Sequence, residues 1–167
     1  MSTTYETSGS IVNENFGVEI MDSEEFMNDE QAKDDFWRLL SELLEEEKVY
    51  HDETGISVNG VYTKESAFGV SYKWKDVFFL LDKDNKRIGC AETAYDHKFG
   101  TYHIGCVIVT KSYRGRGLGK FLMNCIMNEY PGQEFSLNVS LGNPSGIKFY
   151  ESLGFHPTDY KMHRPAK

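Results

Sequence analysis

A glycine-rich loop with three basic residues is the segment of this sequence best suited to chemistry. The loop, Arg114-Gly115-Arg116-Gly117-Leu118-Gly119-Lys120, stands between an apolar run and a segment with helical periodicity. The first N–H groups of a helix lack partners within it, and the helix dipole favours an anion there. Glycines leave room for a phosphate, and the arginines and the lysine supply donors of the right charge. The loop therefore indicates a phosphate-bearing ligand, with a simple turn as the alternative.

Two common phosphate-binding patterns do not fit this loop. The pattern G-x-x-x-x-G-K-[ST] fails because Arg114 occupies its first glycine position and Phe121 its last position. The pattern G-x-G-x-x-G fails because Gly115 and Gly117 are followed by Lys120 where the third glycine should stand. Neither kind of nucleotide site is expected.

The spacing Arg114-x-x-Gly117-x-Gly119 follows an apolar strand and opens a helix. It resembles the acyl-CoA pyrophosphate motif of the GNAT superfamily of N-acetyltransferases. The resemblance implies acetyl-CoA as co-substrate, with the backbone amides from Arg114 to Lys120 around its pyrophosphate.

A second segment carries the same resemblance. Asn143, Tyr150 and Gly154-Phe155 are similar to the family's second motif, Asn-x-x-Ala-x-x-x-Tyr-x-x-x-Gly-Phe, with Gly146 in place of the usual alanine. The two motifs stand at the family's separation, and the resemblance covers about residues 76–160.

The resemblance also implies roles for the strand before the loop. In this family the backbone of that strand holds the thioester. The amide of Val107 would point at the thioester carbonyl and Val109 would pair with the pantetheine arm, with Ile108 between them. These roles belong to the backbone, so the side chains need only fit the sheet.

The second motif implies a proton donor. Tyr150 takes the place of the family's general acid, because a phenol with a pKa of about 10 can donate to a thiolate of similar basicity. Asn143 would bind the pantetheine or its bound water. The structural alternatives are a core tyrosine on an amphipathic helix and a plain helix N-cap.

Two residues are candidates for the general base that takes the proton from the amine. Some members of the family place a glutamate four residues before the amide that polarises the thioester, and counting back from Val107 gives His103. An imidazole with a pKa of about 6.5 can accept that proton directly or through water. Glu92, on the preceding strand, is the competing candidate, and the sequence leaves the choice open.

Apolar periodicity predicts the elements that position these residues. Strands are expected within residues 11–21 and at 77–81, 87–95, 102–110, 135–139 and 155–164, and helices at 23–33, 34–47, from 118 until Pro131 and from 144 to Gly154. Residues 51–75 receive no firm assignment. This order and the resemblance predict an α/β fold of GNAT type: one N-acetyltransferase domain over residues 11–167, after a flexible tail at 1–10. Its mixed, mostly antiparallel central sheet would carry helices on both faces.

The composition fits one globular domain. The chain has 167 residues, of which 40% are hydrophobic and 26% charged. No apolar stretch approaches the roughly 20 residues of a membrane span and no signal-peptide pattern opens the chain, so we expect a cytoplasmic protein with no membrane partner. Cys90, Cys106 and Cys125 lack the spacing of a metal site, and no metal is expected.

Negative charge is concentrated at the front of the chain. Residues 1–60 have a balance of −13 and residues 61–167 a balance of +5, for a net charge of −8. This net charge argues against a nucleic-acid partner. Members of the family wall the acceptor side with their first helices, so the resemblance implies an acidic wall. Such a wall favours a cationic primary amine: a polyamine, an aminoglycoside, or a protein lysine or N-terminus.

We therefore expect an N-acetyltransferase that moves an acetyl group from acetyl-CoA to a small-molecule or protein amine by direct attack in a ternary complex. The alternative is a non-catalytic module of the same fold that binds CoA or masks a partner protein. The sequence leaves open an acyl group longer than acetyl and a homodimer.

Overall fold

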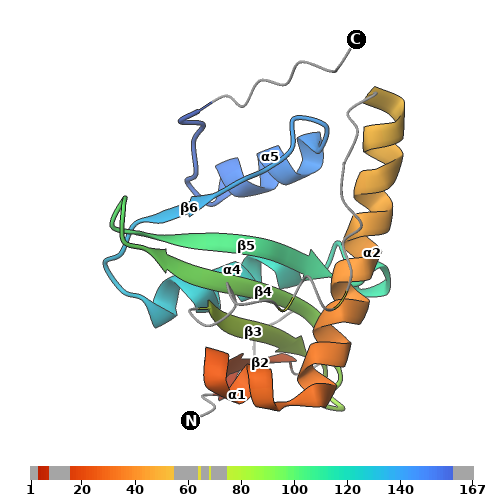
Figure 1. Cartoon of the computed structure of the whole chain (residues 1–167), viewed down its shortest axis with the longest axis vertical. Coiled ribbons are helices and arrows are strands. Elements are labelled where there is room, and N and C mark those ends of the chain that lie inside the picture. The colour runs from red at the N-terminus through yellow and green to blue at the C-terminus, as the bar shows by residue number, and fades with distance from the viewer. Residues whose placement is uncertain (1–3, 8–15, 55–63, 65–67, 69–74, 160–167) are drawn as a thin grey trace.

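The computed structural model describes residues 4–7, 16–54, 64, 68 and 75–159 of the chain. Their strands are β1 (Thr4–Thr7), β2 (Phe16–Met21), β3 (Lys75–Leu81), β4 (Arg87–Asp96), β5 (Thr101–Val109) and β6 (Phe135–Leu137) (Figure 1). The helices are α1 (Ser23–Asn28), α2 (Glu30–Thr54), α4 (Leu118–Glu129) and α5 (Pro144–Ser152), and a short 3-10 turn, η2 (Lys111–Tyr113), follows β5.

The strands form one sheet with a core on each face. They lie in the order β1-β2-β3-β4-β5-β6, and neighbours are antiparallel except for β5 and β6, which run parallel. Phe26 and Phe36 bury α1 and α2 against one face, and Leu122 and Ile126 bury α4 against the other, where α5 also packs. The predicted fold class, a mostly antiparallel mixed sheet between helices, is confirmed.

The sheet opens between β5 and β6. These strands pair over three register positions, of which Ile104 with Leu137 is the last. Just beyond, Gly105 and Cys106 of β5 oppose the single residue Glu92 of β4, which is a β-bulge. A bulge bends its strand, and β5 and β6 diverge from their paired end (Figure 1). The rest of β5 has β4 on one side and, among the described residues, no strand on the other.

The boundary between the two acidic helices lies earlier in the chain than the sequence predicted. The break was expected at residue 34, but α1 ends at Asn28 and α2 begins at Glu30. Asp29 between them has extended backbone, and its carboxylate accepts a hydrogen bond from the Ala32 amide at 3.0 Å. Asp29 therefore caps a new helix, although the apolar period of α2 becomes clear only from Phe36.

Other differences lie near the termini. Residues 4–7, within the expected tail, form β1, because backbone pairing with β2 requires no apolar pattern. The strand expected at 135–139 ends at Leu137. Of the last strand predicted at 155–164, residues 155–159 are not a strand and the remainder lies outside the described residues. Most of the unassigned region 51–75 also lies outside them.

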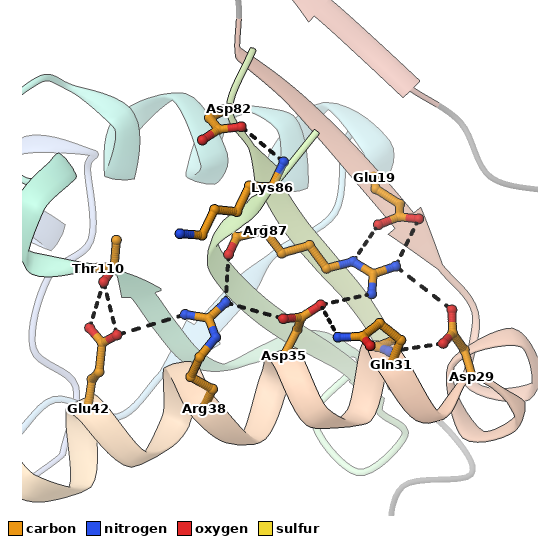
Figure 2. Close-up of polar contacts among 11 residues, drawn as sticks. Glu19, Asp29, Gln31, Asp35, Arg38, Glu42, Asp82, Lys86, Arg87 and Thr110 are labelled. Atoms are coloured by element: carbon orange, nitrogen blue, oxygen red, sulfur yellow. Dashed lines mark hydrogen bonds and ion pairs between the residues drawn. The ribbon is translucent and has the colours of Figure 1, made fainter. Parts of the chain in front are cut away.

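Arg87 joins the acidic N-terminal elements to the sheet. Its guanidinium lies 2.9 Å from Glu19 of β2 and 3.4 Å from Asp35 of α2 (Figure 2). It also lies over the ring of Phe79. Although burial would lower it, the carboxylates of Glu19, Asp29 and Asp35 raise the pKa of Arg87. Part of the negative charge at the front of the chain is therefore paired inside the protein.

Replacing Arg87 by methionine should destabilise the fold, because Glu19 loses the guanidinium that lies 2.9 Å away and Asp35 loses one of its two arginine partners. We expect the free energy of unfolding in urea to fall by roughly 2–4 kcal/mol, a little less than for a fully buried pair. Arg38→Met is the matched control, since the Arg38 side chain is 42% exposed and such pairs contribute about 1 kcal/mol at most. Equal losses in the two variants would contradict the central role of Arg87.

Candidate functional site

The glycine loop leads directly into α4. Gly115 and Gly117 have φ values of 76° and 78°, a conformation that glycine adopts without strain. Gly117 is the N-cap residue of α4 and has no side chain with which to cap the first amides of the helix. Those amides and the positive end of the helix dipole together form an arrangement suited to an anion.

The turn between β3 and β4 holds the loop from one side. The hydroxyl of Tyr113 donates to Asp82 Oδ2 at 3.0 Å, and the Arg116 guanidinium lies over the Tyr113 ring. Asp82 is buried and accepts from the backbone amides of Lys86 and Asp84, each at 2.9 Å. Although burial would raise it, these hydrogen bonds hold the pKa of Asp82 below its usual range. The carboxylate is thus a fixed acceptor for Tyr113 at neutral pH.

Two glutamates of α2 hold the loop from the other side. Glu42 accepts from Thr110 Oγ1 at 2.8 and 2.9 Å (Figure 2). Glu46, one helical turn later, lies 3.1 Å from Arg114 Nη1. The sequence reasoning missed both contacts, because a pair of glutamates four residues apart is equally typical of a solvated helix face.

The amides of Val107 and Val109 point away from β4. The amide of Thr110 donates to the Ile88 carbonyl oxygen at 2.9 Å, so the N–H group of Thr110 points toward β4. Because N–H groups alternate in direction along a strand, the amide of Ile108 also points toward β4. The amides of Val107 and Val109 therefore point to the side from which β6 has diverged, where they can donate to an extended ligand.

Asn143 caps α5 through Gly146. The Asn143 side-chain oxygen accepts from the Gly146 amide at 2.8 Å, and Pro144 fills the first helical position. A Cβ at position 146 would lie 2.6 Å from Asn143 Nδ2. The alanine that the family's motif usually has would therefore force the Asn143 side chain to move. Gly146 and this capping conformation belong together.

Tyr150 is packed between aromatic side chains of α5 and the segment after it. Its ring centre lies 5.1 Å from that of Phe149 and 6.0 Å from that of Phe155. Burial, with a smaller effect of the Cys106 thiol, raises the pKa of Tyr150 to about 12. The phenol therefore stays protonated at neutral pH and can donate a proton. Tyr150 packs against the core cluster on the α4 face of the sheet, as do Val107 and Val109 of β5.

The two candidate bases line one hollow in the sheet. Glu92 and His103 surround it with Thr93, Ala94 and Gly105, and its volume is about 30 Å³, which is room for about one water molecule. A Cβ at Gly105 would lie only 2.5 Å from Glu92 Oε1. The absence of a side chain at Gly105 thus allows the Glu92 carboxylate to lie across the bulge.

His103 is oriented from the other strand of the opening. Its Nδ1 lies 3.2 Å from the hydroxyl oxygen of Ser136, the residue that pairs with it on β6. This hydrogen bond fixes the plane of the imidazole at the end of the sheet where β5 and β6 are still paired.

Val107, Ile108 and Val109 lie on the part of β5 that β6 has left, whereas His103 lies at the paired end, opposite Ser136. The loop from Arg114 to Lys120 follows β5 in the chain. Tyr150 of α5 packs against the same core cluster as Val107 and Val109, and Asn143 is the N-cap of that helix. The sequence reasoning did not find Asp82 or Gly105. The only signal for Gly105 was a glycine inside a strand, which often marks a bulge.

A family model described as "Acetyltransferase (GNAT) family" matches residues 33–155. The chain belongs to this family. It is also 28% identical over 85 residues to the "Uncharacterized N-acetyltransferase ycf52" of Gracilaria tenuistipitata var. liui, a match that covers 51% of this chain and 46% of that relative. The match therefore spans about half the length of the curated relative.

Solved structures share the fold at low sequence identity. A mutant of the BH1408 protein from Bacillus halodurans superposes with a TM-score of 0.65 at 17% identity, covering 89% of this chain and 99% of that one. Aminoglycoside N-acetyltransferase AAC(6')-Iy in complex with CoA gives 0.62 at 16%, covering 93% and 97%. The ribosomal-protein-alanine N-acetyltransferase from Brucella melitensis biovar Abortus 2308 gives 0.60 at 12%, covering 91% and 99%.

Two further properties concern the described residues. None of their helices is both long and apolar enough to cross a bilayer. Within the same residues, no three His, Cys, Asp or Glu side chains are grouped so as to hold a metal ion.

Proposed function

We propose that this chain is an acetyl-CoA-dependent N-acetyltransferase that transfers the acetyl group directly to an amine bound at the same time. The observation that carries this proposal is the pair of outward-pointing amides of Val107 and Val109, on a strand that runs into a glycine loop and an uncapped helix. Backbone donors in that order suit an extended ligand with an anionic end.

The residues present fit acetyl-CoA, which supplies the acetyl thioester. The loop from Arg114 to Lys120 offers backbone donors and positive charge to the pyrophosphate. The amide of Val109 would pair with the pantetheine arm, and the amide of Val107 would donate to the thioester carbonyl oxygen, where negative charge develops. Asn143 would bind the pantetheine or its bound water if its side chain turned from the Gly146 amide.

We assign the general base to Glu92, with His103 as the competing residue. Glu92 follows Ala91, and Ala91 pairs with Val107. Glu92 is therefore next in sequence to the residue opposite Val107, whose amide would hold the thioester. A water in the hollow can pass a proton from the amine to Glu92. His103 lies four residues before Val107 on β5, and its Nδ1 is within hydrogen-bond distance of the Ser136 hydroxyl.

Tyr150 would donate a proton to the departing thiolate. Its phenol is protonated at neutral pH, and burial raises its pKa to about 12, so that it stays protonated in alkaline solution as well. Tyr150 packs against the same core cluster as Val107 and Val109, which supports its reaching the sulfur of a ligand that pairs with β5.

A cationic primary amine is the acceptor that we propose. The support comes from Glu92 in the hollow, and less from the front of the chain, because Asp35, Glu42 and Glu46 are all bonded to basic or hydroxyl groups of the protein. Two structural neighbours carry the names of amine acetyltransferases, one for aminoglycosides and one for the alanine of a ribosomal protein.

Thiol release from acetyl-CoA, measured against polyamines, aminoglycosides, basic peptides and neutral amines, tests the proposed function. We expect release with a cationic primary amine, at a rate that falls as salt is added. Equal rates with neutral amines and no salt dependence would exclude a cationic acceptor. CoA binding without release for any acceptor would favour the non-catalytic module.

Replacing Tyr150 by phenylalanine should lower kcat more than tenfold while the KM for acetyl-CoA changes less than about twofold, because only the proton donor is removed. Since the pKa of Tyr150 is about 12, its ionisation should cause no loss of wild-type activity below about pH 11. Tyr102→Phe, the same change at the paired end of β5, is the control. Unchanged turnover in Tyr150→Phe would remove this residue from the mechanism.

The choice between the two bases can be made with Glu92→Gln and His103→Ala. If Glu92 is the base, Glu92→Gln should lower kcat at least tenfold and abolish the acid limb of the pH–rate profile. Gly105→Ala should lower kcat in the same direction, because a Cβ there displaces the Glu92 carboxylate. A profile altered only by His103→Ala would assign the base to His103.

A further inference from the structure

We propose that Glu46 of α2 is a positioning residue for the loop that would bind acetyl-CoA, and that it acts through Arg114. This inference rests on the proposed function, because it concerns the affinity of the same loop for CoA. It gives α2, a helix on the acceptor face of the sheet, a part in holding the other substrate.

One guanidinium connects three parts of the structure. Arg114 Nη1 lies 3.1 Å from both carboxylate oxygens of Glu46, and Arg114 Nε donates to the Val109 carbonyl oxygen at 2.6 Å. Arg114 is itself the first residue of the glycine loop. The side chain therefore fixes the end of β5 and the start of the loop against α2.

The adjoining contacts act in the same sense. One turn earlier on α2, Glu42 accepts from Thr110, the residue between β5 and η2, and Arg38 lies beside Glu42 (Figure 2). Lys111 Nζ lies 3.4 Å from Glu46. The whole segment from Thr110 to Arg114 is thus held by two carboxylates on one face of the helix.

The charges indicate that this contact serves to position the loop. Although burial would raise it, Arg114 and Lys111 hold the pKa of Glu46 below its usual range, so Glu46 is anionic at neutral pH. Lys111 and Arg114 both contact the Glu46 carboxylate, so one negative charge is paired with two positive charges. The net charge around the loop stays positive, which favours an anionic ligand. Arg114 and Glu46 are about one-third exposed, and pairs of that kind add little to overall stability. Their value is that the loop is ordered before the ligand arrives.

Glu46→Gln tests this proposal, with Glu45→Gln as its matched control. Glu45 is exposed on the same helix, and its replacement removes the same charge. We expect Glu46→Gln to raise the Kd for CoA and the KM for acetyl-CoA about five- to tenfold, with kcat at saturation within twofold and an unchanged melting temperature. Glu45→Gln should change none of these more than twofold.

A double-mutant cycle with Arg114→Gln shows whether Glu46 acts through Arg114. We expect Arg114→Gln to weaken CoA binding and Glu46→Gln to add nothing further in that background. A Kd for Glu46→Gln equal to or below that of Glu45→Gln would overturn the proposal, as would independent effects in the double variant. If Glu46→Gln has a lower melting temperature than the wild type, Glu46→Asp, which keeps the charge, must restore part of the CoA affinity. Failure of Glu46→Asp to restore any affinity would show that the proposal is wrong. A wild-type protein that binds no CoA would instead refute the proposed function.

Discussion

Backbone N–H groups at the edge of a sheet need a partner, and among the residues that the structure describes no strand provides one for β5 beyond its bulge. The two residues that oppose Glu92 bend β5, and β6 departs after three paired positions. The glycine loop continues the open part of this strand, and Tyr150 of α5 packs against the same core cluster as Val107 and Val109. What the site offers an extended anionic ligand is therefore set mainly by backbone direction, which explains why residues 107–109 are ordinary β-branched residues of a sheet.

The division of charge along the chain has a different meaning in three dimensions. The sequence suggested two surfaces of opposite sign, one for an amine and one for a phosphate. In the structure, acidic residues of β2 and α2 contact basic residues of β4 and the loop: Arg87 with Glu19 and Asp35, and Arg114 with Glu46. The opposition of signs thus holds the two halves of the chain together, and only part of it is available to substrates.

The sequence was informative where a local pattern determines structure and uninformative where distant segments meet. The central strand, the glycine loop and the helix capped by Asn143 were predicted because apolar periodicity, a run of glycines and basic residues, and capping are properties of neighbouring residues. The opening of the sheet was not predicted; the family resemblance implied only that the backbone of Val107 and Val109 would hold the ligand. The contacts of Asp82 with Tyr113 and of Glu42 with Thr110 could not be predicted, because they join residues 31 and 68 positions apart. A glycine inside a strand, such as Gly105, is a recognisable signal in the sequence. The need for a glycine there comes from the space taken by the Glu92 carboxylate, which depends on the register of β4 and β5.

The length of α2 has a consequence for how the protein responds to its conditions. The helix runs to Thr54, about two turns past Glu46, and in native proteins helix ends open at a lower free-energy cost than buried strands. Local unfolding that reached Glu46 would release Arg114 while the sheet stayed intact. If the loop binds CoA as proposed, heat or mild denaturant would then weaken CoA binding before the fold is lost, and bound CoA would protect the end of α2 from opening.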